Sequence, residues 1–182
     1  MATSTAIYLP TDSVLDANKH DGLGMVLSAA LPLSVFVIAN GLGELAGVAP
    51  LFFAPFGLPG WVGAVLHVGS LPLFGLARWM VAEHGAAGRR AGWWLVGLMA
   101  ATIALPFLVA PLDFLMISML AVTLLLIGMA TALRVAAVSK RAALIMLPGL
   151  AWMGLSAFVG LSLAAGWSPP FSLTNAQGPA GQ

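Results

Sequence analysis

Five long apolar stretches, separated by short connections, constrain this chain more than any other feature of its sequence. They cover residues 23–46, 60–82, 91–110, 113–137 and 142–166. A helix rises about 1.5 Å per residue, so about 20 residues cross a hydrocarbon core of roughly 30 Å. Sixty per cent of the residues are hydrophobic and 7% are charged, a composition typical of membrane proteins. We therefore predict an all-α integral membrane protein, built as a five-transmembrane-helix bundle.

Positive charge indicates how the predicted helices are oriented. Threading five helices back and forth places every basic residue on one side: Lys19, Arg78, Arg89, Arg90, Arg134, Lys140 and Arg141. The opposite side holds the 47–59 loop, a tight turn near Pro111 and the C-terminal tail, which contain no lysine or arginine. Positive charge stays on the cytoplasmic side during insertion. We therefore expect a multi-pass protein of the bacterial inner membrane, with its N-terminus in the cytoplasm and its C-terminus outside.

The chain divides into a membrane domain and two terminal segments. Residues 1–21 lack the basic stretch and apolar run of a cleavable signal, so they are expected to form an N-terminal cytoplasmic segment. Residues 22–167 form the predicted transmembrane domain. Residues 168–182 are rich in proline, glycine and small polar residues and are expected to form a flexible tail.

Composition excludes several classes of function. The absence of cysteine excludes disulfides, thiolate metal sites and cysteine nucleophiles. The net charge of +1 comes with no contiguous basic surface, so nucleic acid is not an expected partner. No serine, histidine and aspartate have the spacing of a catalytic triad, and we assign no catalytic residue. The expected surroundings are a lipid bilayer.

The connection between the first two helices is unusual. Residues 49–60 contain three prolines, three phenylalanines and no charge. Such a segment is not helical throughout, and its backbone needs protein partners, so we predict that it folds back over the bundle. We assign Phe53 and Phe56 to a ligand site beneath it. Just before it, Gly43 and Gly47 have the spacing of a close helix contact, either within the bundle or in a homodimer.

Three ionisable residues lie toward the outer side of the predicted membrane domain, where such groups suggest function: Glu44, His67 and Asp113. Glu44 and His67 are at similar depth on consecutive helices and are candidates for a pair. Alternatively, Glu44 lies at the interface and His67 bonds a backbone carbonyl, such as one freed by Pro72. Asp113 is expected at the first turn of its helix, where the dipole favours negative charge.

Metal binding rests on one histidine. His67 is a candidate axial ligand for haem iron, because imidazole is a common ligand of that kind. The other histidines, His20 and His84, fall on the opposite side of the membrane, so we predict no multi-histidine metal site.

Trp152 differs from the other tryptophans, most of which fit anchors at the membrane interface. It lies about ten residues into the last predicted helix, away from both interfaces. Its indole N–H needs a partner there, either a neighbouring helix or a bound ligand.

Two local patterns carry a family resemblance. The first is Pro59-Gly60-Trp61-Val62 followed by Gly75-Leu76-Ala77, and the second runs from Ala142 through Pro148 and Trp152 to Ser156. With the five helices and the apolar loop, they resemble the tryptophan-rich sensory protein/translocator family (TspO/MBR). The resemblance implies a pocket under the loop for porphyrin, haem or sterol-like ligands, often in a homodimer. The site positions that it implies are Trp61, His67, Trp152, Ser156 and Asp113.

The chain departs from the family pattern within these segments. His67 stands where the family has tryptophan, Gly63 replaces phenylalanine, and Gly149 replaces the tyrosine after the proline. The resemblance therefore indicates a divergent member.

The favoured function is a membrane receptor or carrier that binds a flat, mostly apolar ligand under the 49–60 loop, with a transport or regulatory role. It requires no cofactor, and porphyrin or haem enters as a ligand. Two other hypotheses stay open. One is a small interaction subunit of a larger membrane complex. The other is a membrane enzyme acting on a tetrapyrrole or lipid, with Glu44 or His67 as its acid–base group.

Overall fold

The computed structural model describes residues 22–167, which contain five helices and no strands. The helices are α2 (Gly22–Leu45), α3 (Gly60–Ala82), α4 (Gly85–Leu108), α5 (Phe114–Ala136) and α6 (Lys140–Trp167). Each is long and apolar enough to cross a membrane. The predicted five-helix, all-α membrane fold is confirmed. The predictions for residues 1–21 and 168–182, including Lys19 and His20, lie outside the described residues.

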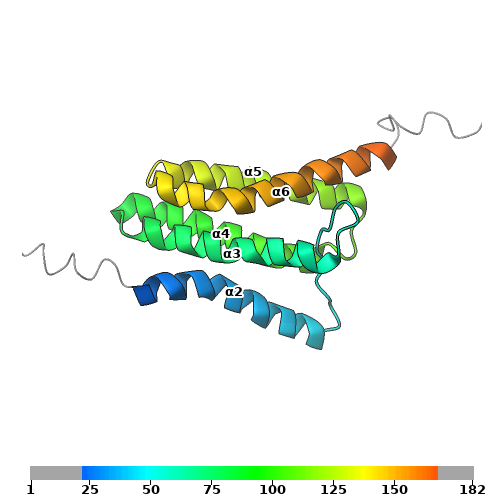
Figure 1. Cartoon of the computed structure of the whole chain (residues 1–182), viewed down its shortest axis with the longest axis horizontal. Helices are drawn as coiled ribbons and strands as arrows, with labels where there is room; N and C mark the ends of the chain where they lie inside the picture. The colour runs from blue at the N-terminus through cyan, green and yellow to red at the C-terminus, as the bar shows by residue number, and fades with distance from the viewer. Residues whose placement is uncertain (1–21, 168–182) are drawn as a thin grey trace, which may run out of the picture.

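Four helices form the body of the bundle, and the first lies along its edge (Figure 1). α5 and α6 pack most extensively against one another, and α3 packs against both α6 and α4. α4 and α5 are neighbours, as the tight turn between them predicts, although their contact is less extensive than that of α5 with α6. α2 packs mainly against α3 and touches α4 more sparsely. Its side chains are therefore the least buried of the five helices.

One helix boundary differs clearly from the prediction. α4 begins at Gly85, six residues before the predicted start at residue 91, so Arg89 and Arg90 lie inside the helix. Gly88 packs against the carbonyl of Val81, which makes the connection between α3 and α4 very short. Apolarity alone places the helix start too late, because a helix continues readily through arginines near a membrane interface.

Two groups of side chains hold the bundle together. The larger joins α3, α4, α5 and α6 around buried residues that include Phe74, Leu95, Leu98, Val135 and Met146. The smaller consists of Phe36, Leu71 and Ile103, with Phe52 and Phe107 packed against them. It connects α2 and the following loop to α3 and α4, and its Phe52 also lines the site described below.

Prolines inside the helices leave backbone carbonyls without their usual partners. Proline has no N–H, so the carbonyl four residues earlier loses its helical hydrogen bond. Pro32 in α2 frees the Ser28 carbonyl, and Pro106 in α4 frees the Thr102 carbonyl. The Ser28 carbonyl lies against Gly75 of α3, where a β-carbon would collide with it. These two freed carbonyls each lie where one helix approaches another.

The ends of the bundle differ in charge. All six lysines and arginines among the described residues lie near the α3–α4 and α5–α6 connections. Here the Arg134 guanidinium carbon lies 4.2 Å from the centre of the Trp94 ring. The other end, with the 46–59 loop and the α4–α5 turn, has no lysine or arginine. The described residues keep the charge segregation that the sequence predicts.

Candidate ligand-binding site

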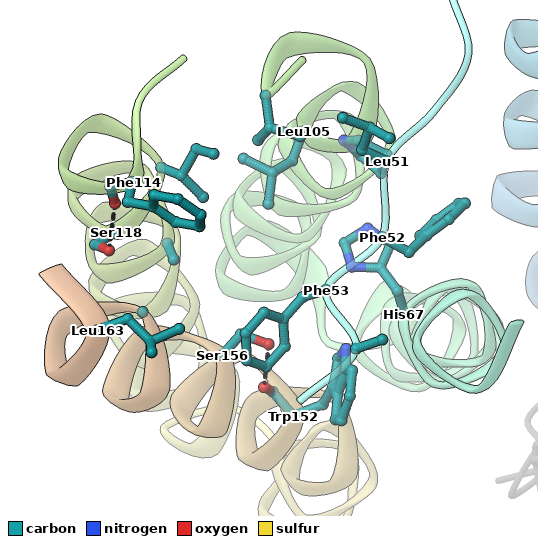
Figure 2. Close-up of a pocket in the computed structure, with 16 residues that line it drawn as sticks. Leu51, Phe52, Phe53, His67, Leu105, Phe114, Ser118, Trp152, Ser156 and Leu163 are labelled. Carbon is teal, nitrogen blue, oxygen red and sulfur yellow. Dashed lines mark hydrogen bonds between the residues drawn. The ribbon is translucent and has the colours of Figure 1, made fainter. Parts of the chain in front are cut away.

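A cavity of about 350 Å³ lies at the uncharged end of the bundle, under the 46–59 loop (Figure 2). Four loop residues cover it, and its walls come from α3, the end of α4, the start of α5 and α6. The lining residues are Leu51, Phe52, Phe53, Ala54, His67, Leu105, Pro106, Val109, Phe114, Ile117, Ser118, Ala121, Trp152, Ser156, Gly160 and Leu163. Most are apolar, so the cavity suits a ligand that is itself mostly apolar.

α2 ends, and the loop begins, at a turn that requires a glycine. Gly47 has a φ of 72°, and its N–H donates to the Glu44 carbonyl over 3.1 Å. The Val48 N–H donates to the Gly43 carbonyl over 2.8 Å, which completes a Schellman motif. Gly47 therefore ends the helix, and the expectation that Gly43 and Gly47 share a helix-packing face is wrong. Gly43 alone packs closely, with Phe107 of α4.

Backbone contacts hold the loop over the cavity. The Leu51 N–H donates to the Pro106 carbonyl at the end of α4 over 2.8 Å. On α3, Gly63 lies directly under the Phe53 carbonyl, and any β-carbon at Gly63 would overlap that oxygen. These contacts supply protein partners to an apolar loop, which folds back over the bundle as predicted.

The three phenylalanines of the loop take different directions. Phe53 contacts Trp152, with ring centroids 6.0 Å apart. Phe52 lies on the other side of the loop, with its ring 5.8 Å from that of His67 in an edge-to-face arrangement (Figure 2). Phe56, with a φ of 60°, is 80% exposed and lies outside the cavity lining. Of the two phenylalanines assigned to the ligand site, Phe53 lines the cavity and Phe56 does not, while Phe52, which was not assigned, also lines it.

His67 bonds a carbonyl that Pro106 leaves free. Its Nε2 lies 2.8 Å from the Thr102 carbonyl oxygen, four residues before Pro106. A carbonyl only accepts, so Nε2 must carry the hydrogen and donate it. The predicted bond to a freed carbonyl is thus present, although Pro106 rather than Pro72 frees it. The bond fixes the ring at the cavity wall and leaves Nδ1 as an acceptor in the neutral imidazole.

The cavity offers polar atoms of two kinds. No fully buried side-chain nitrogen or oxygen among the described residues lacks a hydrogen-bond partner. The Trp152 indole N–H and His67 Nδ1 have no hydrogen-bond partner within residues 22–167. Because every fully buried nitrogen has a partner, these two nitrogens are not fully buried. Since both residues line the cavity, it provides one N–H donor and one ring-nitrogen acceptor beside apolar walls.

Two hydroxyls add acceptors. The Ser156 hydroxyl donates to the Trp152 carbonyl over 2.9 Å, and the Ser118 hydroxyl donates to the Phe114 carbonyl over 2.6 Å (Figure 2). Each oxygen keeps lone pairs for another donor. Sequence reasoning misses Ser118, which faces Gly160 across the α5–α6 contact. α5 carries two further hydroxyls, on Thr123 and Thr131, so its sequence alone does not single out Ser118.

Three other predicted residues lie elsewhere. Glu44 is exposed and accepts from the Asn40 side chain over 3.3 Å, so the Glu44–His67 pair does not form. Trp61 is the second residue of α3 and is 67% exposed, outside the cavity lining. Asp113 is the N-cap of α5 and accepts from the Met116 N–H over 2.7 Å. Its place at the helix start is as predicted, but it stabilises the helix end rather than lining the cavity.

The cavity therefore gathers Phe53, His67, Trp152 and Ser156 from the predicted set. Within residues 22–167, no group of three or more histidine, aspartate or glutamate side chains is placed to hold a metal ion. The arrangement suits a mostly apolar ligand that also makes a few hydrogen bonds. Compared with known proteins, the chain matches no family model, no curated protein and no solved structure.

Proposed function

We propose that this protein is a membrane receptor or carrier for a flat, mostly apolar ligand of the sterol-like, porphyrin or haem kind. The observation that carries the proposal is the cavity beneath the loop, with the Trp152 N–H and His67 Nδ1 free within apolar walls. Such a site is typical of pockets in which shape provides affinity and a few polar atoms fix orientation.

The volume of the cavity favours the smaller ligands of this class. Its 350 Å³ lies near the lower limit of ligand pockets, which range from about 300 to 1,000 Å³. A compact sterol-like ring system fits that volume better than a whole porphyrin does. A porphyrin needs the loop or the surrounding side chains to move outward, so we expect weaker binding for it.

Haem coordination through His67 requires a particular nitrogen. Nε2 is already bonded to the Thr102 carbonyl, so Nδ1 is the nitrogen left for iron. That hydrogen bond also fixes the imidazole ring, so Nδ1 cannot turn toward an iron atom without breaking it. We favour binding of haem as an apolar ring over coordination, and a Soret shift lost in His67→Ala would reverse that preference.

The proposal includes a family relationship. We propose that the chain is a divergent relative of the tryptophan-rich sensory protein/translocator family. Support comes from the five-helix bundle, the loop after the first helix, and the position of Trp152 four residues after Pro148, inside the cavity. The loss of pocket aromatics at Gly63 and Gly149 has a structural counterpart, since Gly63 admits the loop and Gly149 packs against Phe74.

A titration of purified protein tests the proposal. Cholesterol, protoporphyrin IX and haem are added in turn to detergent-solubilised protein, and tryptophan quenching is followed. We expect saturable binding of at least one ligand, weakened about tenfold by Trp152→Phe, because the indole N–H donor and part of the aromatic contact area are lost. Ala121→Leu, which reduces the cavity, is expected to weaken binding as well.

Trp61→Phe is the matched control, because Trp61 is exposed and does not line the cavity. It removes the same indole group and is expected to leave affinity unchanged. Equal losses in the two tryptophan variants, or no saturable binding of any of the three ligands, would overturn the proposed function.

A further inference from the structure

A second hollow, of about 240 Å³, lies on the side of the bundle between α2, α3 and α4. We call it the α2–α4 groove. It is lined by Ser28, Leu31, Pro32, Val35, Arg78, Val96, Met99, Ala100 and Ile103. None of these residues lines the ligand cavity, so the groove is a separate site.

The groove exists because α2 has two different points of close contact. Toward the loop, Phe36 packs against Phe107 of α4, with ring centroids 6.0 Å apart. Toward the basic end, α2 instead approaches α3, where the Ser28 carbonyl meets Gly75. Between these two points α2 leaves α4 uncovered. The opening spans the eight residues from Ser28 to Val35, a rise of about 10 Å along the helix.

Arg78 gives the groove a positive end. It is the one charged residue in the lining and lies four residues before the end of α3, inside the membrane-spanning helix. Its guanidinium has no hydrogen bond or ion pair with any residue in 22–167. An arginine at this depth requires an anionic partner or must extend to the interface.

Arg89 adds a second charge on the same side. Arg78 is four residues before the end of α3 and Arg89 is four residues after the start of α4, so the antiparallel hairpin brings them to the same level. Arg89 is also seven residues before Val96, which places both on one face of α4. Trp93 lies between them on that face and is 74% exposed.

We propose that the α2–α4 groove binds an anionic phospholipid, with its phosphate on Arg78 and Arg89 and an acyl chain against the apolar residues. The charges lie at one end, at the level expected for headgroups, and the remaining lining residues are apolar except Ser28. Basic pockets between transmembrane helices bind phospholipid headgroups by this combination. The site is independent of the ligand cavity and holds whether or not the proposed function is correct.

Native mass spectrometry of the full chain in detergent tests the site. Dioleoyl phosphatidylglycerol and dioleoyl phosphatidylcholine are titrated against wild type, Arg78→Gln and Arg90→Gln. We expect wild type to prefer phosphatidylglycerol, and Arg78→Gln to lower its retention about fivefold, the effect of one basic residue near a headgroup. Arg90→Gln removes the same charge from a different face of α4 and is expected to change little. Equal losses in the two variants would show general surface attraction and overturn the proposal.

The acyl-chain part of the site has its own test. Ala100 is exposed and lines the groove, so Ala100→Phe fills it and is expected to reduce retention of phosphatidylglycerol with both arginines present. Unchanged retention would overturn the groove as the binding site.

A measurement on the wild-type chain tests the site without relying on variants that could fold incorrectly. Phosphatidylglycerol with a photoreactive acyl chain is expected to label Met99 and residues 28–35. Adducts spread evenly over the bundle, or a dimer whose interface excludes lipid from the groove, would overturn the proposal.

Discussion

His67 and Pro106 depend on one another through a single carbonyl group. Pro106 leaves the Thr102 carbonyl without a helical donor, and His67 supplies one from the neighbouring helix at 2.8 Å. The same proline offers its own carbonyl to the Leu51 N–H of the loop. One residue that interrupts a helix thus positions both a cavity-lining side chain and the segment that covers the cavity.

A double-mutant cycle tests this dependence. We expect His67→Leu to lower the free energy of unfolding by about 1–3 kcal/mol, because it leaves a buried carbonyl unpaired. Pro106→Ala restores an N–H four residues after Thr102, so the loss caused by His67→Leu is expected to shrink in that background. Thermal unfolding in detergent measures all four proteins. The same loss in both backgrounds would contradict the pairing.

At the scale of elements, glycines determine where the loop and the first helix approach the bundle. Gly63 admits the loop, Gly75 admits α2, and Gly47 ends α2 with a positive φ. Gly63 and Gly75 have no space for a β-carbon, and the positive φ of Gly47 disfavours any other residue. The loop and α2 therefore depend on small residues of their neighbours as well as on their own apolar side chains.

Replacing Gly63 by alanine is expected to displace the loop, because the new methyl group overlaps the Phe53 carbonyl. Loss of the Leu51 hydrogen bond and the Phe53–Trp152 contact should weaken ligand binding about tenfold. Hydrogen exchange at the Leu51 amide should quicken at the same time. Gly69→Ala, on the same helix with no atom near the new methyl group, serves as the control. Slow Leu51 exchange in Gly63→Ala would show that the loop does not rest on this glycine.

Sequence reasoning predicts the helices well and the site only in part. Long apolar stretches suffice for five helices, but they place the start of α4 six residues late. Trp152 lines the cavity, and an indole at mid-membrane is conspicuous in the sequence. Glu44 is misassigned because depth along a helix says nothing about direction, and it bonds Asn40 on its own helix. Phe52 and Ser118 depend on loop direction and helix rotation, which composition does not encode.

At the scale of the whole molecule, charge and cavity lie at opposite ends. The described basic residues gather near the α3–α4 and α5–α6 connections, and the cavity opens under the 46–59 loop. If the positive end faces the cytoplasm, as such residues do in inserted proteins, the ligand site faces the outside. The orientation therefore decides from which side a ligand enters.

The absence of cysteine from the sequence makes this orientation directly testable. Phe56→Cys places a thiol on the exposed part of the loop, and Ala86→Cys places one at the α3–α4 end. A membrane-impermeant maleimide is expected to label Phe56→Cys in intact spheroplasts, and Ala86→Cys only after permeabilisation. The reverse pattern would invert the topology while leaving the fold unchanged.

The hydrogen bond between α3 and α4 has a consequence for how the protein is made. A carbonyl without a hydrogen-bond partner is unfavourable in lipid. Inserting α4 without α3 would therefore leave the Thr102 carbonyl unpaired in the bilayer. The histidine that satisfies it lies in the preceding helix and is synthesised first. The α3–α4 hairpin, with a connection too short to separate the two helices, is therefore suited to enter the bilayer as one unit during translation.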